Sequence, residues 1–341
     1  MDEYFSASDL KICIVKLSAM GDIIHAMVAL QFIKQNLPNV QIDWIVEESF
    51  RGVLDNNPHI DTILPVNLKS IKTNKMKIFS QIKLLRHYAK NNYDVVIDAQ
   101  GLLKSAIVSK ILDGRIVGSF IAGFDKDSIR EGLASFFYER TVFIGYEKNV
   151  IDRNIKVLCK TLDITVDKEE ILNKKPFLYN NSKLKNNLLD SIIFVVGASK
   201  ENKIYPKEKF LEIAQKLKQK ILVVWGNDAE YATALWLSEQ SELITLDSRG
   251  NLEDLKCKIQ NSKLVIGGDT GPTHMAWALN IPSITIFGNT PEYRNTYSTN
   301  INKVIKSETI VDPLKIDKND FSIRNIKSDN IVKLAKELLG C

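Results

Sequence analysis

The chain has 341 residues, of which 45% are hydrophobic, 26% charged and 8% aromatic, and its formal charge at pH 7 is +5. These fractions exclude a disordered chain, a collagen and a disulfide scaffold, and the length suits two domains that each bury a core. Its apolar runs are far shorter than the roughly 20 residues of a membrane-spanning helix, so we expect a soluble protein. The small positive excess suits an anionic ligand or a membrane surface and does not require nucleic acid.

The amino terminus and the cysteines indicate a cellular compartment. The opening sequence, MDEYFSASDLKICIVK, is acidic and lacks a long apolar stretch, so it predicts no secretory signal and a cytoplasmic protein. The four cysteines, Cys13, Cys159, Cys257 and Cys341, form no CxxC pair. This spacing fits a reducing compartment and predicts no structural zinc.

In the first half of the chain, short apolar runs alternate with helical patterns, which is typical of βα units and a parallel sheet. The predicted strands are 11–17, 41–46, 61–65 and 93–98. Helices are expected after Gly21, near Lys75 and after Gly101.

The second half repeats this alternation. The predicted strands are 192–197, 220–225, 242–246, 263–267 and 282–287, with helices at 206–218, 228–240, 251–260 and 272–279. Residues 165–190 are rich in Lys, Asn and Asp and predict a surface excursion and a linker. We therefore expect two doubly wound α/β domains, 1–180 and 181–325, with ligands bound in a cleft at the carboxyl ends of both sheets. A last helix within 326–341 could belong to either domain, including packing back on the first.

The stretch KLSAMGDIIHA, 16–26, combines a strand end, a turn at Gly21 and Asp22 at the start of a helix. A carboxylate at the carboxyl edge of a sheet is placed to act as a general base. Asp is also favoured in the first turn of a helix, so a structural role for Asp22 stays open. His25, one turn later, could equally be a packed or surface histidine.

Two further stretches of the first half could meet a ligand. In DAQGLLKSA, 98–106, Asp98 and Gln100 could cap a turn or bind a polyhydroxylated ligand, and Lys104 follows in the first helical turn. Residues 69–90 mix lysines with apolar residues at helical spacing. That pattern fits an anionic acceptor, an anionic lipid surface, or a core-packed helix with a solvated face.

In the second half, GASKENKIYPKEKF, 197–210, is a polar loop after a strand, closed by a proline at a helix start. Ser199 and Lys203 could bring a hydroxyl and an ammonium group to a diphosphate, although solvated lysines are common. The loop is not a Walker motif, because GxxxxGK[ST] is absent. Glu230, on the helix after Trp225, could bond ribose hydroxyls or be an exposed helical residue.

The stretch GGDTGPTHMAWA, 267–278, is the most specific feature of the chain. Its glycines allow close approach of the backbone to a ligand, and Asp269 and Thr270 lie at the turn. Gly271 and a proline begin a helix whose first N–H groups point outward, which predicts an anion site made of backbone. A glycine-rich turn capped by Asp269 or Thr270 is the structural alternative. His274 could line the same site or pack in the core.

Taken together, these motifs resemble the ADP-heptose:lipopolysaccharide heptosyltransferases, glycosyltransferase family 9. KLSAMGDIIHA is similar to the amino-terminal signature of the family, VIDAQGLLKSA to its second motif and DTGPTHMAWAL to its donor motif. The segment DSIREGLASFFYER, 127–140, is similar to the one that distinguishes the heptosyltransferase I branch. The resemblance implies a GT-B fold of two Rossmann-like domains, with the acceptor bound mainly by the first and ADP-heptose mainly by the second.

The resemblance also implies an activity. It is the inverting transfer of L-glycero-D-manno-heptose from ADP-heptose to the Kdo of the lipopolysaccharide inner core, without metal or cofactor. The implied acceptor is Kdo-lipid A, met at the cytoplasmic face of the inner membrane. Asp22 would be the catalytic base, and Lys203 would offset charge on the departing ADP. The implied donor-binding residues are Ser199, Lys203, Glu230, Asp269, Thr270, Gly271 and His274. The implied acceptor-binding residues are Lys69, Lys72, Gln100, Lys104 and Arg130.

The same motifs are compatible with other functions. A family 9 transferase acting on a later core heptose, or a sugar-nucleotide epimerase, would share the donor motifs. A two-domain protein that binds a nucleotide sugar without turnover is an alternative of another class, and substrate consumption would distinguish it. No basic-aromatic motif indicates nucleic acid, and no GxGxxG follows a predicted strand, which excludes an NAD dehydrogenase.

Overall fold

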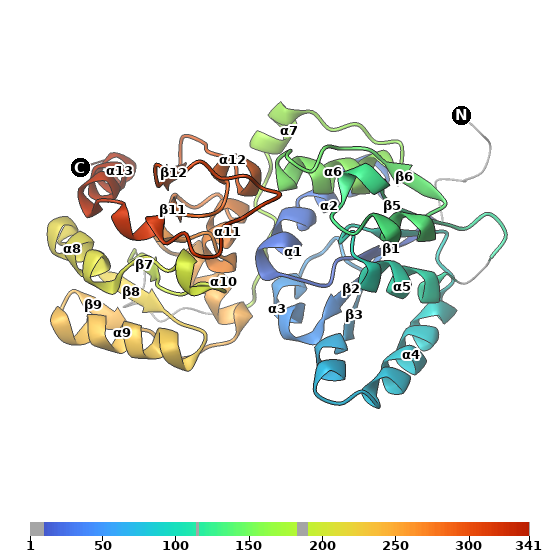
Figure 1. Cartoon of the computed structure of the whole chain (residues 1–341), viewed down its shortest axis with the longest axis horizontal. Helices are drawn as coiled ribbons and strands as arrows, with labels where there is room; N and C mark the ends of the chain where they lie inside the picture. The colour runs from blue at the N-terminus through green and yellow to red at the C-terminus, as the bar shows by residue number, and fades with distance from the viewer. Residues whose placement is uncertain (1–9, 114–115, 183–189, 341) are drawn as a thin grey trace. The chain divides into compact units, whose positions relative to one another are not determined.

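The structure is a computed structural model of the whole chain, and it describes residues 10–113, 116–182 and 190–340. The chain divides into two compact units, Met1–Phe177 and Leu178–Cys341 (Figure 1). The division falls close to the boundary that we predict after residue 180. The predicted linker residues 183–189 lie outside the described part, and a short helix occupies 168–172 within the predicted excursion.

The first unit contains a six-stranded parallel sheet in the order β3-β2-β1-β4-β5-β6. Its strands are β1 (Lys11–Val15), β2 (Gln41–Glu47), β3 (Thr62–Val66), β4 (Val95–Asp98), β5 (Phe120–Phe124) and β6 (Arg140–Val142). β1 lies at the centre, and its residues from Ile12 to Val15 are completely buried. Continuous burial is expected of a parallel strand, because helices cover both faces of such a sheet.

Helices cover both faces of this sheet. They are α1 (Met20–Met27), α2 (Ala29–Asn36), α3 (Arg51–Leu54), α4 (Lys77–Tyr88), α5 (Leu103–Leu112), α6 (Val150–Lys160) and α7 (Lys168–Leu172). Short 3-10 helices are η1 (Glu48–Phe50), η2 (Leu68–Lys72), η3 (Ala89–Asn91), η4 (Lys126–Ser128) and η5 (Gly132–Phe137). α1 and α2 pack against α6, whereas α4 and η5 pack against α5 (Figure 1).

The second unit repeats the arrangement with the strand order β12-β11-β10-β7-β8-β9, again all parallel. Its strands are β7 (Ile192–Val195), β8 (Ile221–Val224), β9 (Ile244–Leu246), β10 (Leu264–Gly268), β11 (Ser283–Phe287) and β12 (Asn302–Lys306). Its helices are η7 (Glu201–Lys203), α8 (Lys207–Leu217), α9 (Asp228–Gln240), α10 (Leu252–Gln260), α11 (Gly271–Ala278), α12 (Glu292–Asn295), η8 (Ser322–Asn325) and α13 (Ser328–Leu339). α8 packs against α9, and α10 packs against α11.

The carboxy-terminal helix α13 belongs to the second unit. It packs against α8, and Ile331, Val332 and Ala335 join the core that contains Phe194 and Phe210. The sequence leaves open which domain this helix belongs to, and its contacts place it in the second unit. The apolar face of α13 is buried by its own unit.

Both sheets have the strand order of a doubly wound nucleotide-binding fold, with a switch point where the chain reverses its direction of winding. The switch point lies between β1 and β4 in the first sheet and between β7 and β10 in the second. Ligands of such folds bind beside the carboxyl ends of these strands. The motifs around Asp22, Gln100, Lys203 and Asp269 each follow one of these four strands.

The nine strands predicted from the sequence are confirmed, with shifts of a few residues at their ends. Three strands were missed, namely β5, β6 and β12. β6 has only three residues, of which Arg140 and Thr141 are exposed. β12 is a polar edge strand. Neither β6 nor β12 carries the buried apolar run on which the prediction relied, whereas β5 is buried along its whole length and was overlooked.

Candidate active site

Gln100 joins the two loops at the switch point of the first sheet. β1 and β4 are paired there, with Val15 opposite Asp98. The Gln100 Oε1 atom accepts hydrogen bonds from the backbone N–H groups of Leu17 and Ser18, both at 3.1 Å. Gln100 therefore fixes the loop that leads into α1. Acceptor binding by Gln100 stays a prediction.

Asp98 stabilises the turn before α5, as its capping interpretation predicts. Its Oδ1 atom accepts the backbone N–H groups of Gln100 and Gly101 at 2.8 and 3.1 Å, and its Oδ2 accepts the Tyr138 hydroxyl at 2.8 Å. The side chain is completely buried. Burial raises the pKa of Asp98, and the hydrogen bonds from Tyr138 and the backbone counter this only in part.

Asp22 is the third residue of α1 and is partly exposed. Its Oδ2 atom accepts the backbone N–H of Ala19 at 3.1 Å, so the side chain closes the helix start. An acidic residue in the first turn is typical of a helix start. Along the described chain this is the one hydrogen bond found for the Asp22 carboxylate, which leaves an oxygen to accept a proton from a ligand. His25, one turn later, is buried and is not a surface residue.

The predicted acceptor-binding lysines lie around the end of β2. Lys69, on η2, places its Nζ 3.2 Å from the Ser49 hydroxyl and above the Phe50 ring. Lys104, in the first turn of α5, forms an ion pair of 3.6 Å with the buried Glu47. Lys72, at the end of η2, and Arg130, after η4, are both exposed. The roles of these four residues stay predictions.

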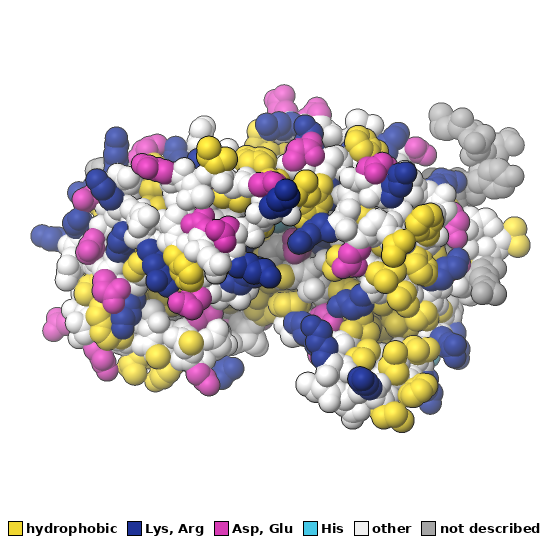
Figure 2. Space-filling view, in the orientation of Figure 1, with side chains coloured by type: hydrophobic (Ala, Val, Ile, Leu, Met, Phe, Trp, Pro, Cys, Tyr) yellow, Lys and Arg dark blue, Asp and Glu magenta, His cyan; other side chains and the backbone are white. Residues whose placement is uncertain are grey.

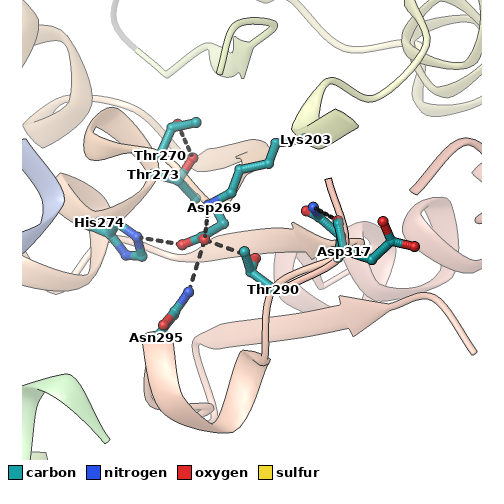
Figure 3. Close-up of polar contacts among 9 residues, drawn as sticks. Lys203, Asp269, Thr270, Thr273, His274, Thr290, Asn295 and Asp317 are labelled. Carbon is teal, nitrogen blue, oxygen red and sulfur yellow. Dashed lines mark hydrogen bonds and ion pairs between the residues drawn. The ribbon is translucent and has the colours of Figure 1, made fainter. Parts of the chain in front are cut away.

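Asp269 is the centre of a polar network in the second unit (Figure 3). It follows β10, and its Oδ1 atom lies 3.0 Å from His274 Nε2. Its Oδ2 atom accepts hydrogen bonds from Lys203 Nζ at 2.8 Å, Thr290 Oγ1 at 3.0 Å and Asn295 Nδ2 at 3.0 Å. We call these five residues the Asp269 network. Four side chains, from η7, α11 and the segment after β11, converge on one carboxylate, so Asp269 organises the carboxyl edge of this sheet.

The network keeps Asp269 ionised although its side chain is only 8% exposed. Burial by itself would raise the pKa of Asp269, but the positive charge of Lys203 and the contact with His274 outweigh it. The pKa therefore lies well below the ordinary range of a carboxyl group. In return, the carboxylate holds the Lys203 ammonium group in one place at the end of β7.

The backbone around Lys203 is equally restrained. Asn202 is buried, and its Nδ2 atom donates a hydrogen bond of 3.0 Å to the Lys318 carbonyl. A Cβ atom at Gly268 would lie 3.1 Å from the Lys203 carbonyl oxygen. A glycine at 268 allows β10 and η7 to approach each other closely, and this places Lys203 beside Asp269.

The amino terminus of α11 lies next to this pair. α11 begins at Gly271, with Pro272 in its first turn. The residue before it, Thr270, forms no side-chain capping bond, and its hydroxyl lies 3.4 Å from that of Thr273. An uncapped helix start with a nearby ammonium group is suited to an anion. His274 is buried and belongs to the Asp269 network, and donor binding by His274 stays a prediction.

Glu230 closes the start of α9. Its Oε2 atom accepts the backbone N–H of Gly226, and its Oε1 accepts Asn227 Nδ2, both at 2.7 Å. A Cβ atom at Gly197 would collide with the Glu230 carboxyl group, so the glycine admits this side chain beside β7. Ser199 is exposed in the same loop. Ribose binding by Glu230 and phosphate binding by Ser199 stay predictions.

Thr290 and Asn295 were missed by the sequence analysis. Both follow β11, the neighbour of β10, so their segment starts at the same edge of the sheet as Asp269. The polar string FGNTPEYRN after a buried strand is the signal that could have found them. Among the described residues, no three or more His, Cys, Asp or Glu side chains form a group suited to a metal ion.

Known proteins resemble this chain along nearly its whole length. The model of glycosyltransferase family 9 (heptosyltransferase) matches residues 81–316. Lipopolysaccharide heptosyltransferase 1 of Campylobacter coli is 40% identical, over 97% of this chain and 99% of the relative.

Among solved structures, the heptosyltransferase WaaC of E. coli with ADP superimposes with a TM-score of 0.81 at 24% identity, covering 96% of this chain and 100% of that one. The same protein with ADP-2-deoxy-2-fluoro heptose gives 0.78 at 25% identity, covering 96% and 99%. The two doubly wound domains are thus the expected GT-B fold. The chain belongs to glycosyltransferase family 9, the heptosyltransferases, and is a glycosyltransferase.

Proposed function

We propose that the protein transfers L-glycero-D-manno-heptose from ADP-heptose to the Kdo of the lipopolysaccharide inner core. The Asp269 network carries this proposal, because it fixes a lysine beside an uncapped helix start at the second switch point. The relative from Campylobacter coli is named a lipopolysaccharide heptosyltransferase 1, and the E. coli structures contain ADP or a fluorinated ADP-heptose. These names agree with the donor and acceptor that the motifs imply.

In the proposed donor site, the ADP-heptose diphosphate meets Lys203, Ser199 and the amino terminus of α11. Thr270 and Gly271 contribute a hydroxyl and a backbone N–H there, and Glu230 meets the ribose. Asp269 already accepts hydrogen bonds from four side chains, so we assign it chiefly to holding Lys203 and His274. A contact of Asp269 with the heptose would add to that role.

In the proposed reaction, Asp22 accepts the proton of the acceptor hydroxyl as its oxygen attacks the anomeric carbon. The bond from that carbon to the diphosphate oxygen breaks with inversion, and the electron pair leaves with ADP. Charge that grows on the leaving diphosphate is stabilised by Lys203 and by the helix start. We propose that these groups act without a metal ion and that no other cofactor takes part.

The proposed acceptor is Kdo-lipid A, which Lys69, Lys72, Gln100, Lys104 and Arg130 would meet in the first unit. A lipid-linked acceptor places the protein at the cytoplasmic face of the inner membrane as a peripheral protein. In the described part of the chain, no helix has the length and apolarity needed to cross a membrane. Contact with the membrane would therefore involve the protein surface.

The test is release of ADP by the purified protein from ADP-heptose, with and without Kdo-lipid A and in the presence of EDTA. We expect release that depends on the acceptor and persists in EDTA. Release only with an acceptor that already carries heptose would instead support transfer to a later core heptose. A strict need for a divalent cation would overturn the metal-independent mechanism.

A further inference from the structure

Exposed apolar side chains gather on one side of the first unit. They lie on three neighbouring segments, since α5 packs against both α4 and η5. The members are Met76 and Phe79 at the start of α4, Leu103 and Ile107 on α5, and Leu133 and Phe136 on η5. We call these six residues the apolar surface. Figure 2 shows hydrophobic side chains gathered over α4 and α5 with lysine and arginine side chains around them.

The core does not explain these side chains. The second half of α4 packs inward through Leu84, Leu85 and Tyr88, but in its first turn Phe79 is 67% exposed. On η5, Phe137 packs against the core, whereas its neighbour Phe136 is 80% exposed. Exposed apolar groups of this size, gathered on adjacent segments, mark a surface that meets a partner.

The charge beside the apolar surface indicates what that partner is. Residues 62–93 contain six lysines and one arginine and no Asp or Glu. Lys72, Lys75 and Lys77 are exposed next to Met76 and Phe79, and along the described chain none of the three forms an ion pair. Glu131, the residue before η5, has a carboxylate that accepts the backbone N–H of Leu103 at 2.7 Å.

From this combination we infer that the apolar surface is where the protein docks on an anionic phospholipid bilayer. Met76, Phe79 and Phe136 would enter the interface between headgroups and acyl chains, while Lys75 and Lys77 would meet the phosphates. Apolar anchors surrounded by lysines are the chemistry that binds such an interface. The inference deepens the proposed membrane contact by naming the surface that makes it.

The test uses the full chain and two kinds of vesicle, phosphatidylcholine alone and phosphatidylcholine mixed with phosphatidylglycerol. We expect the wild type to bind only the mixed vesicles, and high salt to weaken that binding. The double variant Phe79→Glu/Phe136→Glu should bind the mixed vesicles at least about tenfold more weakly than the wild type. The affinity of Lys75→Gln/Lys77→Gln for these vesicles should fall several-fold. The matched control is Leu314→Glu, which changes an exposed leucine of the second unit and should bind as the wild type does.

Three kinds of result would overturn the inference. One concerns the vesicles: no binding by the wild type, or equal binding by Phe79→Glu/Phe136→Glu with its thermal unfolding unchanged. Another is a wild type that self-associates and becomes monomeric in this variant, since the surface would then join two copies. The third is lost turnover of a water-soluble Kdo acceptor by the variant, which would assign the surface to acceptor binding. If the wild type binds vesicles but turns over no acceptor, the proposed function fails and the docking surface stands.

Discussion

The two switch points hold their key carboxylates in opposite ways. Asp269 is buried and accepts hydrogen bonds from four side chains, whereas Asp22 is partly exposed and accepts one backbone N–H. A carboxylate with its bonding capacity filled can position other groups but is poorly placed to accept a proton. A carboxylate with a free oxygen can do so. From this difference we propose that the second unit organises the donor and that the first unit carries out proton transfer.

The largest effect is expected from Asp22→Asn. The amide keeps the shape of the side chain but cannot act as a base, so kcat should fall by roughly 10³-fold. ADP-heptose binding should stay unchanged. The control is Asp163→Asn, an exposed carboxylate of the same unit. An Asp22→Asn enzyme that works at a near-normal rate would remove Asp22 from its role.

Asp269→Asn tests the other side of the comparison. It removes the charge that compensates Lys203 in a buried site, which should destabilise the protein by about 3 kcal/mol in urea unfolding. The control is Asp329→Asn, which removes the partner of Lys216 in an exposed ion pair and should leave stability unchanged. Equal stability of the two variants would show that the Asp269 network is not a structural centre.

Loss of single partners in the network should have smaller effects. Asn295→Ala or Thr290→Val each removes one hydrogen bond to Asp269, worth about 1 kcal/mol. Because Lys203 would be held less firmly, we expect the KM for ADP-heptose to rise several-fold with little change in kcat. Asn319→Ala, at an exposed position, is the control. A fall in kcat at constant KM would argue against donor positioning.

The pH dependence of stability should differ in sign between Asp269 and Asp98. The pKa of Asp269 is lowered in the folded state, so its contribution to stability is present above the ordinary value of 3.8 and is lost on acidification below it. The pKa of Asp98 is raised, so its contribution grows as the pH falls through its folded pKa towards 3.8. Urea unfolding should be measured as a function of pH. On acidification, the free energy of unfolding should fall less in Asp269→Asn than in the wild type, and the gain that Asp98 contributes should be smaller in Asp98→Asn. The same pH profile in both variants would contradict the assignment.

Much of the fold could be predicted because the central strands are continuous apolar runs. The segments KICIVKL and IIFVVG are examples, and each is followed by a polar loop that marks the carboxyl edge of its sheet. The edge strands β6 and β12 carry exposed polar residues and no such signal.

The candidate site could be predicted only as separate loops. Lys203 and Asp269 each follow a strand, but their pairing depends on β7 and β10 being neighbours. Thr290 and Asn295 reach Asp269 through tertiary packing after β11, which no local pattern contains. The Glu47–Lys104 pair was missed for the same reason.

The most direct test of the division between the two switch points is the affinity for ADP-heptose, measured by titration calorimetry for Asp22→Asn and Lys203→Ala side by side. The account predicts wild-type affinity in Asp22→Asn, and a loss of at least about tenfold in Lys203→Ala from the missing charge-assisted contact. The opposite pattern, or an equal loss in both variants, would contradict it.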